Sequence, residues 1–99
     1  MSILDEIGLP ALLEQTAEEA TELAHAALKL SRIERKENPT PVSLRYAYDN
    51  LKEEVADVLN CISVLAGDEV INQSEIDEIM EHKFERWYKR LRNQREVKR

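Results

Sequence analysis

Apolar residues recur every three or four positions along three long stretches of the chain, which is the spacing of amphipathic α-helices. The pattern predicts helices over roughly residues 10–36, 43–67 and 74–93, and no stretch alternates apolar and polar residues as a strand would. We therefore expect an all-α fold, a small helical bundle in which residues 1–99 form a single domain. Residues 1–9 are compatible either with a short helical turn or with an arm.

Capping and turn residues mark the ends of these helices. Pro10 suits a first helical turn, where its missing N–H has no intrahelical partner. The Asn-Pro-Thr-Pro run at 38–41 predicts a loop after the first helix. Ser43 is the expected N-cap of the second helix, which should stop near Gly67, and Ser74 is the expected N-cap of the third.

Composition narrows the class of protein. Apolar residues make up 42% of the chain, which is too many for a wholly disordered protein. The single cysteine, Cys61, cannot form an intramolecular disulfide, and no N-terminal stretch has the pattern of a signal peptide. No apolar run approaches the roughly 20 residues needed to span a bilayer. We expect a soluble, cytoplasmic protein without a membrane partner.

Charge is distributed unevenly along the chain. The formal net charge is -6, yet residues 83–99 hold eight of the 14 Lys and Arg residues and only two of the 20 acidic ones. An acidic body with a basic tail does not suit a duplex-binding domain, so no specific nucleic-acid partner is expected. This distribution of charge is instead compatible with a metal ion bound by the acidic body and a phosphate group bound near the basic tail. Residues beyond about 93 are expected to fray.

Two acidic pairs occupy matching positions on the first and second helices. Glu19 and Glu22 lie three residues apart beside one apolar arc, and Glu54 and Asp57 do the same on the next helix. At about 100° per residue the two patterns superpose. If the helices pack through their arcs, four carboxylates converge, and Mg²⁺ prefers such oxygen ligands. The pattern thus predicts a metal site; the alternative is two solvated helix edges.

The segments EEATEL (residues 18–23) and EEVADVL (residues 53–59) resemble the motifs of the MazG-like all-α nucleoside triphosphate pyrophosphohydrolases. In that superfamily an E-x-x-E on one helix precedes an E-x-x-D on the next, and the resemblance covers roughly residues 10–90. It implies a bundle completed by dimerisation, as a homodimer or a dimer of dimers. It also implies Mg²⁺-dependent hydrolysis of a (deoxy)nucleoside triphosphate between the α and β phosphates, giving monophosphate and pyrophosphate, with Mn²⁺ as an alternative metal.

The resemblance also implies roles for individual carboxylates. Glu18 or Glu53 would act as the catalytic base that accepts a proton from the attacking water. The ligands of the metal would be Glu19, Glu22, Glu54 and Asp57.

Candidate substrate contacts lie on the third and first helices. Lys83 and Arg86 stand at a spacing comparable to that of triphosphate contacts in the family, although members with Asn at the second position differ from this chain. Gln15 lies one turn before Glu19 on the same helix edge and is a candidate contact to the base.

Two other functions are compatible with the pattern. The stretch EEATELAHAALK also resembles phosphoribosyl-ATP pyrophosphohydrolase of histidine biosynthesis, although the connector after the first helix is longer than expected for that enzyme. A non-enzymatic helical interaction or regulatory module would instead use the acidic edges as surface. On this alternative we expect neither metal dependence nor hydrolysis.

Overall fold

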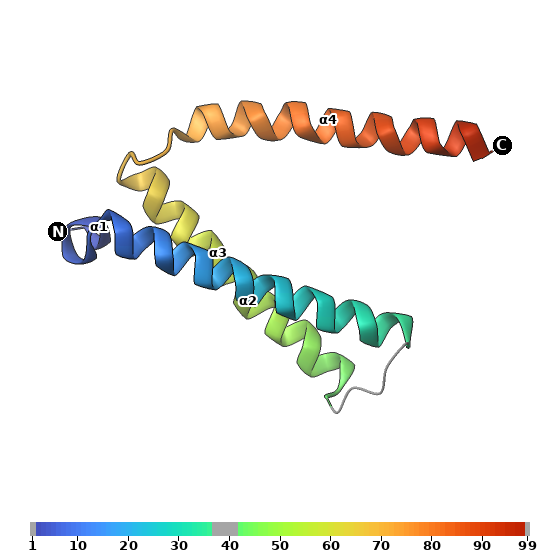
Figure 1. The fold of residues 1–99 in the computed structure, drawn as a ribbon, viewed down its shortest axis with the longest axis horizontal. Coiled ribbons are helices and arrows are strands. Elements are labelled where there is room, and N and C mark those ends of the chain that lie inside the picture. Colours follow the sequence, from blue (N-terminus) through green and yellow to red (C-terminus); the bar gives the residue numbers. More distant parts are fainter. Residues whose placement is uncertain (1, 37–41, 99) are drawn as a thin grey trace. The chain divides into compact units, whose positions relative to one another are not determined.

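The computed structural model describes residues 2–36 and 42–98, and every regular element in these ranges is an α-helix (Figure 1). The expected all-α fold of the helical-bundle type is therefore confirmed. The chain divides into two compact units, and the boundary between them in the sequence falls between Asp68 and Glu69. The helices are α1 (Ile3–Ile7), α2 (Leu9–Arg35), α3 (Leu44–Gly67) and α4 (Gln73–Lys98).

The start of the chain is helical, which decides between the two alternatives left by the sequence. Ser2 caps α1: its Oγ accepts a hydrogen bond from the Asp5 N–H at 3.0 Å, and its own N–H donates to Asp5 Oδ2 at 3.4 Å. Gly8 separates α1 from α2 with a φ of 83°, a value that a residue with a Cβ rarely adopts. Although α1 is short, Ser2 therefore fixes where it begins and Gly8 fixes where it ends.

The ends of α2 agree with the sequence to within one residue. Pro10 lies in the first turn, as expected. Lys36 ends the helix in the left-handed region, with φ 57°, and its N–H donates to the carbonyl of Arg32. The loop predicted at 38–41 lies outside the described residues.

The N-cap of α3 was predicted correctly, and that of α4 was not. Ser43 Oγ accepts a hydrogen bond from the Tyr46 N–H at 3.1 Å, and α3 ends at Gly67 as expected. At the start of α4, Asn72 rather than Ser74 accepts the capping bond, from the Glu75 N–H at 3.0 Å. Since the side-chain oxygen of Asn72 makes this bond, Asn72 is the N-cap, and α4 begins at Gln73, one residue earlier than predicted.

The last helix is longer than the sequence predicted. Instead of fraying near residue 93, α4 remains helical to Lys98. The range 73–98 contains no glycine or proline and is rich in Glu, Lys, Arg and Gln, which favour helix. Within the described ranges, no helix combines the length and the apolar character that a bilayer crossing requires.

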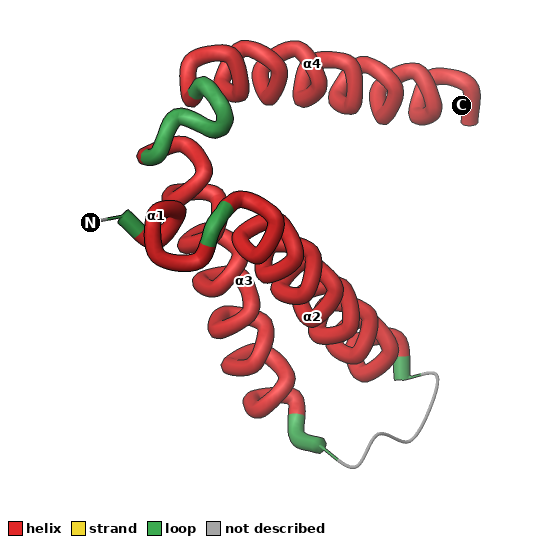
Figure 2. Tube along the Cα trace, turned by 60° about the vertical axis from the view of Figure 1, so that its left-hand side comes forward, coloured by secondary structure: helices red, strands yellow, loops and turns green. Residues whose placement is uncertain are grey.

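The helices α2 and α3 run antiparallel and side by side (Figures 1 and 2). Their buried side chains follow a narrow seam, with a step of 14 residues and then a step of four in each helix. Glu19 and Glu54 are half-buried and stand midway along the 14-residue step, seven residues from the buried residue on either side, so each lies on the seam itself. The buried residues are Leu12, Ala26 and Leu30 on α2 and Ala47, Cys61 and Leu65 on α3.

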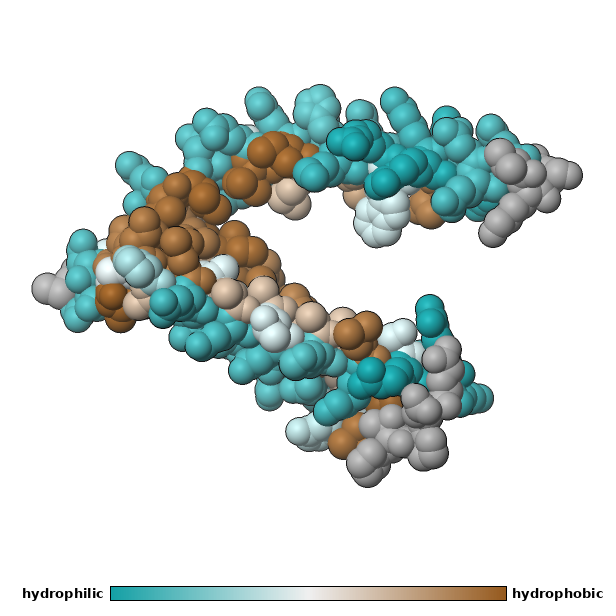
Figure 3. All heavy atoms as spheres, in the orientation of Figure 1, coloured by the Kyte–Doolittle hydropathy of each residue, from teal (hydrophilic) through white to brown (hydrophobic). Residues whose placement is uncertain are grey.

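The seam follows the acidic edge of each apolar arc instead of its centre, and the expectation that the helices pack through the arcs is wrong in this respect. Leu13, Val55 and Leu59 belong to the arcs, yet they are 49%, 38% and 55% exposed. The seam instead contains small residues, such as Ala26 and Ala47, beside the larger side chains of Leu12, Leu30 and Leu65. Figure 3 shows brown and pale apolar residues along one edge of the α2–α3 pair, with hydrophilic residues on the other side.

Candidate metal centre

Three carboxylates converge where the seam of α2 and α3 passes through its acidic positions. One carboxylate oxygen from each of Glu19, Glu22 and Glu54 lies within 4.8 Å of the other two. Glu19 and Glu22 project from neighbouring turns of α2, because residues three apart share one side of a helix. Glu54 reaches them from α3. The predicted convergence of the two acidic edges is therefore observed for these three residues, which we call the carboxylate triad.

Two oxygens of the triad are buried without a hydrogen-bond partner. These are Glu19 Oε2 and Glu54 Oε2, and neither has a donor among the residues that the structure describes. Buried polar atoms in proteins are nearly always hydrogen-bonded, because removing them from water without compensation is costly. Hard oxygen donors, close spacing and uncompensated negative charge are the features that suit a divalent cation such as Mg²⁺. The triad thus has the ligand chemistry of a divalent-cation site.

The pKa values of the two seam carboxylates are raised. Burial is the largest cause for Glu19, followed by the charges of Glu22 and Asp57. For Glu54 burial again comes first, followed by the charge of Glu22, a side-chain hydrogen bond with Glu22, and the charges of Asp57 and Glu19. The neighbouring negative charges thus add to the effect of burial on the pKa values of Glu19 and Glu54, and a bound cation would oppose the effect of those charges.

The fourth predicted ligand, Asp57, lies at the border of the triad. It does not share the mutual spacing of the other three, but its charge is among the causes that raise the pKa of Glu19. Its side chain is exposed, one turn after Glu54 on α3. Asp57 as a metal ligand remains a prediction.

Gln15 contacts the triad directly. Its Nε2 donates a hydrogen bond of 2.7 Å to Glu19 Oε1, which by itself lowers the pKa of Glu19 but does not outweigh burial. One oxygen of Glu19 is therefore held by an amide while the other is the unpartnered Oε2. Gln15 thus orients the carboxylate; its predicted contact with a nucleotide base is a separate prediction.

The candidate bases lie on the exposed flanks of the helix pair. Glu18 and Glu22 line an open depression on α2 together with His25. Glu53 is exposed beside Glu54 on α3. His25 lies three residues after Glu22 on the same side of α2, and this spacing in the sequence is what indicates that the imidazole adjoins the acidic flank.

Lys83 and Arg86 lie in the second unit, on α4. Their side chains are exposed and line a shallow depression together with Trp87 and Arg90. A positively charged surface of this kind is suited to phosphate groups. Their role as substrate contacts remains a prediction.

No protein-family model, curated protein or solved structure matches this chain. The site is consequently defined by its own chemistry. It belongs to an all-α protein in which an antiparallel helix pair holds three carboxylates together, with two of their oxygens buried and unpartnered.

Proposed function

We propose that the protein is a Mg²⁺-dependent pyrophosphohydrolase of (deoxy)nucleoside triphosphates, of the MazG-like kind. The observation that carries this proposal is the carboxylate triad with its two buried, unpartnered oxygens. The reaction itself is inferred from the resemblance of the two acidic motifs on α2 and α3. That reaction cleaves between the α and β phosphates and releases monophosphate and pyrophosphate.

In this proposal Glu19, Glu22 and Glu54 hold the ion, with Asp57 beside them. Bound there, Mg²⁺ would supply positive charge to neutralise phosphate oxygens and to make a water molecule more acidic. Gln15 keeps Glu19 in position through its 2.7 Å hydrogen bond.

The remaining roles fall to groups around the triad. Glu18 and Glu53 are exposed carboxylates, each adjacent in sequence to a triad residue, and either could take the proton of the attacking water. Lys83 and Arg86 offer positive charge for the phosphates. A homodimer or a dimer of dimers is part of the proposal, and exposed apolar side chains such as Leu13 and Leu59 support it.

Product analysis tests the proposal. The purified protein is incubated with a panel of ribo- and deoxyribonucleoside triphosphates and Mg²⁺, with and without a chelator. We expect monophosphate and pyrophosphate, and no turnover once the chelator removes the metal. Diphosphate with phosphate as products would overturn the assigned bond. Turnover of phosphoribosyl-ATP alone would favour the histidine-pathway reaction, and no turnover of any substrate would favour an interaction module.

A matched pair of variants assigns the activity to the triad. Glu54→Gln removes one triad carboxylate, and Glu14→Gln removes the same charge from an exposed position on α2. We expect Glu54→Gln to lose more than roughly 100-fold in kcat/KM, because even residues that only support a metal ligand contribute about 10- to 100-fold. Glu14→Gln should retain full activity. Equal activity in both variants would remove the triad from the mechanism.

A further inference from the structure

One side of α4 exposes a long apolar stripe. Six large apolar or aromatic side chains on this helix are between 49% and 64% exposed, and four of them, at 80, 84, 87 and 91, repeat with the four- and three-residue steps of a coiled-coil seam. Exposed apolar surface of this extent marks an interaction site. The six are Ile79, Met80, Phe84, Trp87, Tyr88 and Leu91.

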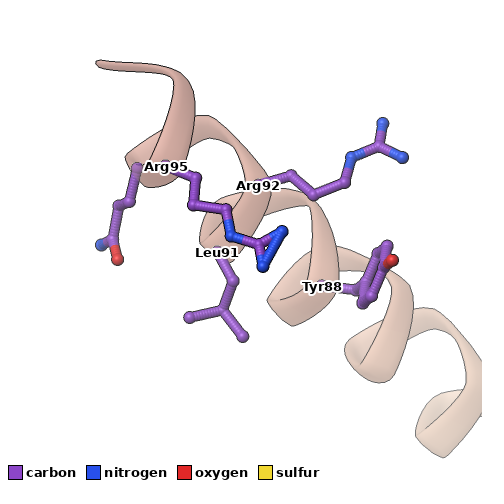
Figure 4. Close-up of a pocket in the computed structure, with 5 residues that line it drawn as sticks. Tyr88, Leu91, Arg92 and Arg95 are labelled. Carbon is purple, nitrogen blue, oxygen red and sulfur yellow. The ribbon is translucent and has the colours of Figure 1, made fainter. Parts of the chain in front are cut away.

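Contacts within the helix hold this stripe in shape. Phe84 and Trp87 meet edge to face, with ring centroids 6.3 Å apart and an interplanar angle of 80°. The Arg92 guanidinium lies over the Tyr88 ring, 5.7 Å from its centroid. Figure 4 shows this C-terminal part of α4, with Tyr88, Leu91, Arg92 and Arg95 projecting from its turns. Rigid aromatic groups of this kind lose little conformational freedom on binding.

The charge of α4 changes sign near the middle of the helix, from negative in its first part to positive in its second. Residues 73–82 contain four acidic residues and neither Lys nor Arg, whereas residues 83–98 contain seven Lys and Arg residues and two Glu. Positions equidistant from the point between Lys83 and Phe84 carry opposite charges in four pairs. These pairs are Glu75 with Arg92, Asp77 with Arg90, Glu78 with Lys89, and Glu81 with Arg86. Within the described part of the chain, none of the ion pairs involves α4.

We propose that α4 pairs with α4 of a second copy of the chain, in the antiparallel direction and with Phe84 beside the two-fold axis. In this register Ile76 lies level with the partner's Leu91, and Met80 with the partner's Trp87. Each acidic half then lies along a basic half, whereas a parallel pair would place like charges together. The proposal rests on α4 alone and does not depend on the hydrolase function.

Charge also argues against other occupants of the stripe. A nucleic acid or an anionic membrane would attract the basic half, residues 83–98, but would be repelled by the acidic half, residues 73–82. A second copy complements both halves at once. The stripe runs from Ile79 to Leu91, which is about 18 Å of helix at 1.5 Å per residue, so it provides a seam of about three turns.

Disulfide cross-linking of the full-length chain tests both the pairing and its direction. The native thiol is first removed by Cys61→Ala, and circular dichroism confirms that the helices persist. Phe84→Cys alone should form a disulfide-linked dimer under mild oxidation, because the two Phe84 positions adjoin the axis. Met80→Cys and Trp87→Cys should each fail alone and should cross-link when mixed, since these positions lie opposite each other in the antiparallel register.

Other cross-linking patterns overturn the proposal. A parallel pair would give a different result: Met80→Cys would cross-link with itself, Trp87→Cys would cross-link with itself, and the mixture would form no mixed disulfide. No linkage by any variant would show that something else covers the stripe or that it stays exposed. Exchange of a charge pair provides a second measurement in the Phe84→Cys background: Asp77→Arg and Arg90→Asp should each slow cross-linking, and the double exchange should restore it. Failure of restoration would overturn the charge register.

Discussion

At the scale of single residues, Glu19 and Glu54 have the strongest claim to a function. Each occupies a seam position where the pattern would otherwise place an apolar side chain, and each has a buried oxygen without a partner. Their pKa values are raised, first by burial and then by neighbouring carboxylates. A charged group placed at this cost supports the proposed metal site, in which a cation would supply the counter-charge.

Removing one of these charges should stabilise the metal-free protein at neutral pH. In Glu54→Gln the side chain keeps its shape, while its repulsion with Glu19 and Glu22 disappears. We expect the melting temperature in the presence of a chelator to rise by a few degrees relative to the wild type. Thermal unfolding followed by circular dichroism measures this, with Glu14→Gln as the exposed control. A lower melting temperature for Glu54→Gln alone would mean that this carboxylate stabilises the fold.

The same pKa shifts predict a pH dependence with a definite sign. Between the ordinary glutamate pKa of about 4.3 and the raised values of Glu19 and Glu54, the folded state binds more protons than the unfolded state. The contribution of these groups to the free energy of unfolding therefore falls as pH rises through that window. We expect the metal-free double variant Glu19→Gln/Glu54→Gln to exceed the wild type in melting temperature at pH 7. This difference should shrink as pH falls through the window, and a difference independent of pH would contradict the assignment.

At the scale of the elements, periodicity and capping chemistry predicted most of the fold. The apolar spacing located α2, α3 and α4, and Ser43 and Gly67 bounded α3 as expected. The cap of α4 was missed because Asn72 and Ser74 are both good N-cap residues and only the backbone decides between them. Propensity alone would have extended α4 beyond 93, where the prediction relied instead on the usual fraying of chain ends.

The acidic cluster was predictable, but the packing that forms it was not. Matching phase placed Glu19, Glu22 and Glu54 together, and the structure has them within 4.8 Å. A helical wheel does not say which part of a wide apolar arc a partner helix will cover. Ala26 and Ala47 are buried at the acidic edge, whereas Ala20, Ala24 and Ala27 on the arc of α2 are just as small and stay exposed, so side-chain size by itself does not select the seam.

This packing predicts where α3 will not tolerate a larger side chain. Ala47 is only 1% exposed, so Ala47→Leu inserts volume into a closed seam and should destabilise the protein by about 1–3 kcal/mol. Ala56→Leu adds the same atoms to an exposed position of the same helix and should change stability by no more than about 0.5 kcal/mol. Chemical denaturation measures both. Equal effects would mean that α2 and α3 do not pack along this seam.

At the scale of the whole molecule, charge is separated along the sequence. Residues 1–82 contain eighteen acidic residues and six Lys and Arg residues, and the basic excess lies beyond them. A concentrated negative charge destabilises a compact fold through self-repulsion, and a cation bound specifically to the folded state relieves part of it.

Magnesium should accordingly raise the melting temperature of the protein. At millimolar Mg²⁺ we expect a rise of several degrees over a KCl solution of the same ionic strength, since binding to the folded state shifts the unfolding equilibrium. Differential scanning calorimetry provides the measurement, and it does not depend on catalysis. Glu54→Gln should lose most of the rise and Glu14→Gln should keep it. The same rise in KCl would reveal general screening instead of a site.

Because Glu19 and Glu54 lie on the packing seam, a substitution there that stabilises the fold would remove a carboxylate that the proposed activity needs. Leucine at both positions would complete the seven-residue pattern that begins with Leu12 and Ala47, turning the helix pair into an ordinary apolar hairpin. Such a protein would be more stable and would have lost two of the three carboxylates of the triad. Improvement of the fold and preservation of the chemistry therefore compete for the same two side chains, so selection for one opposes the other.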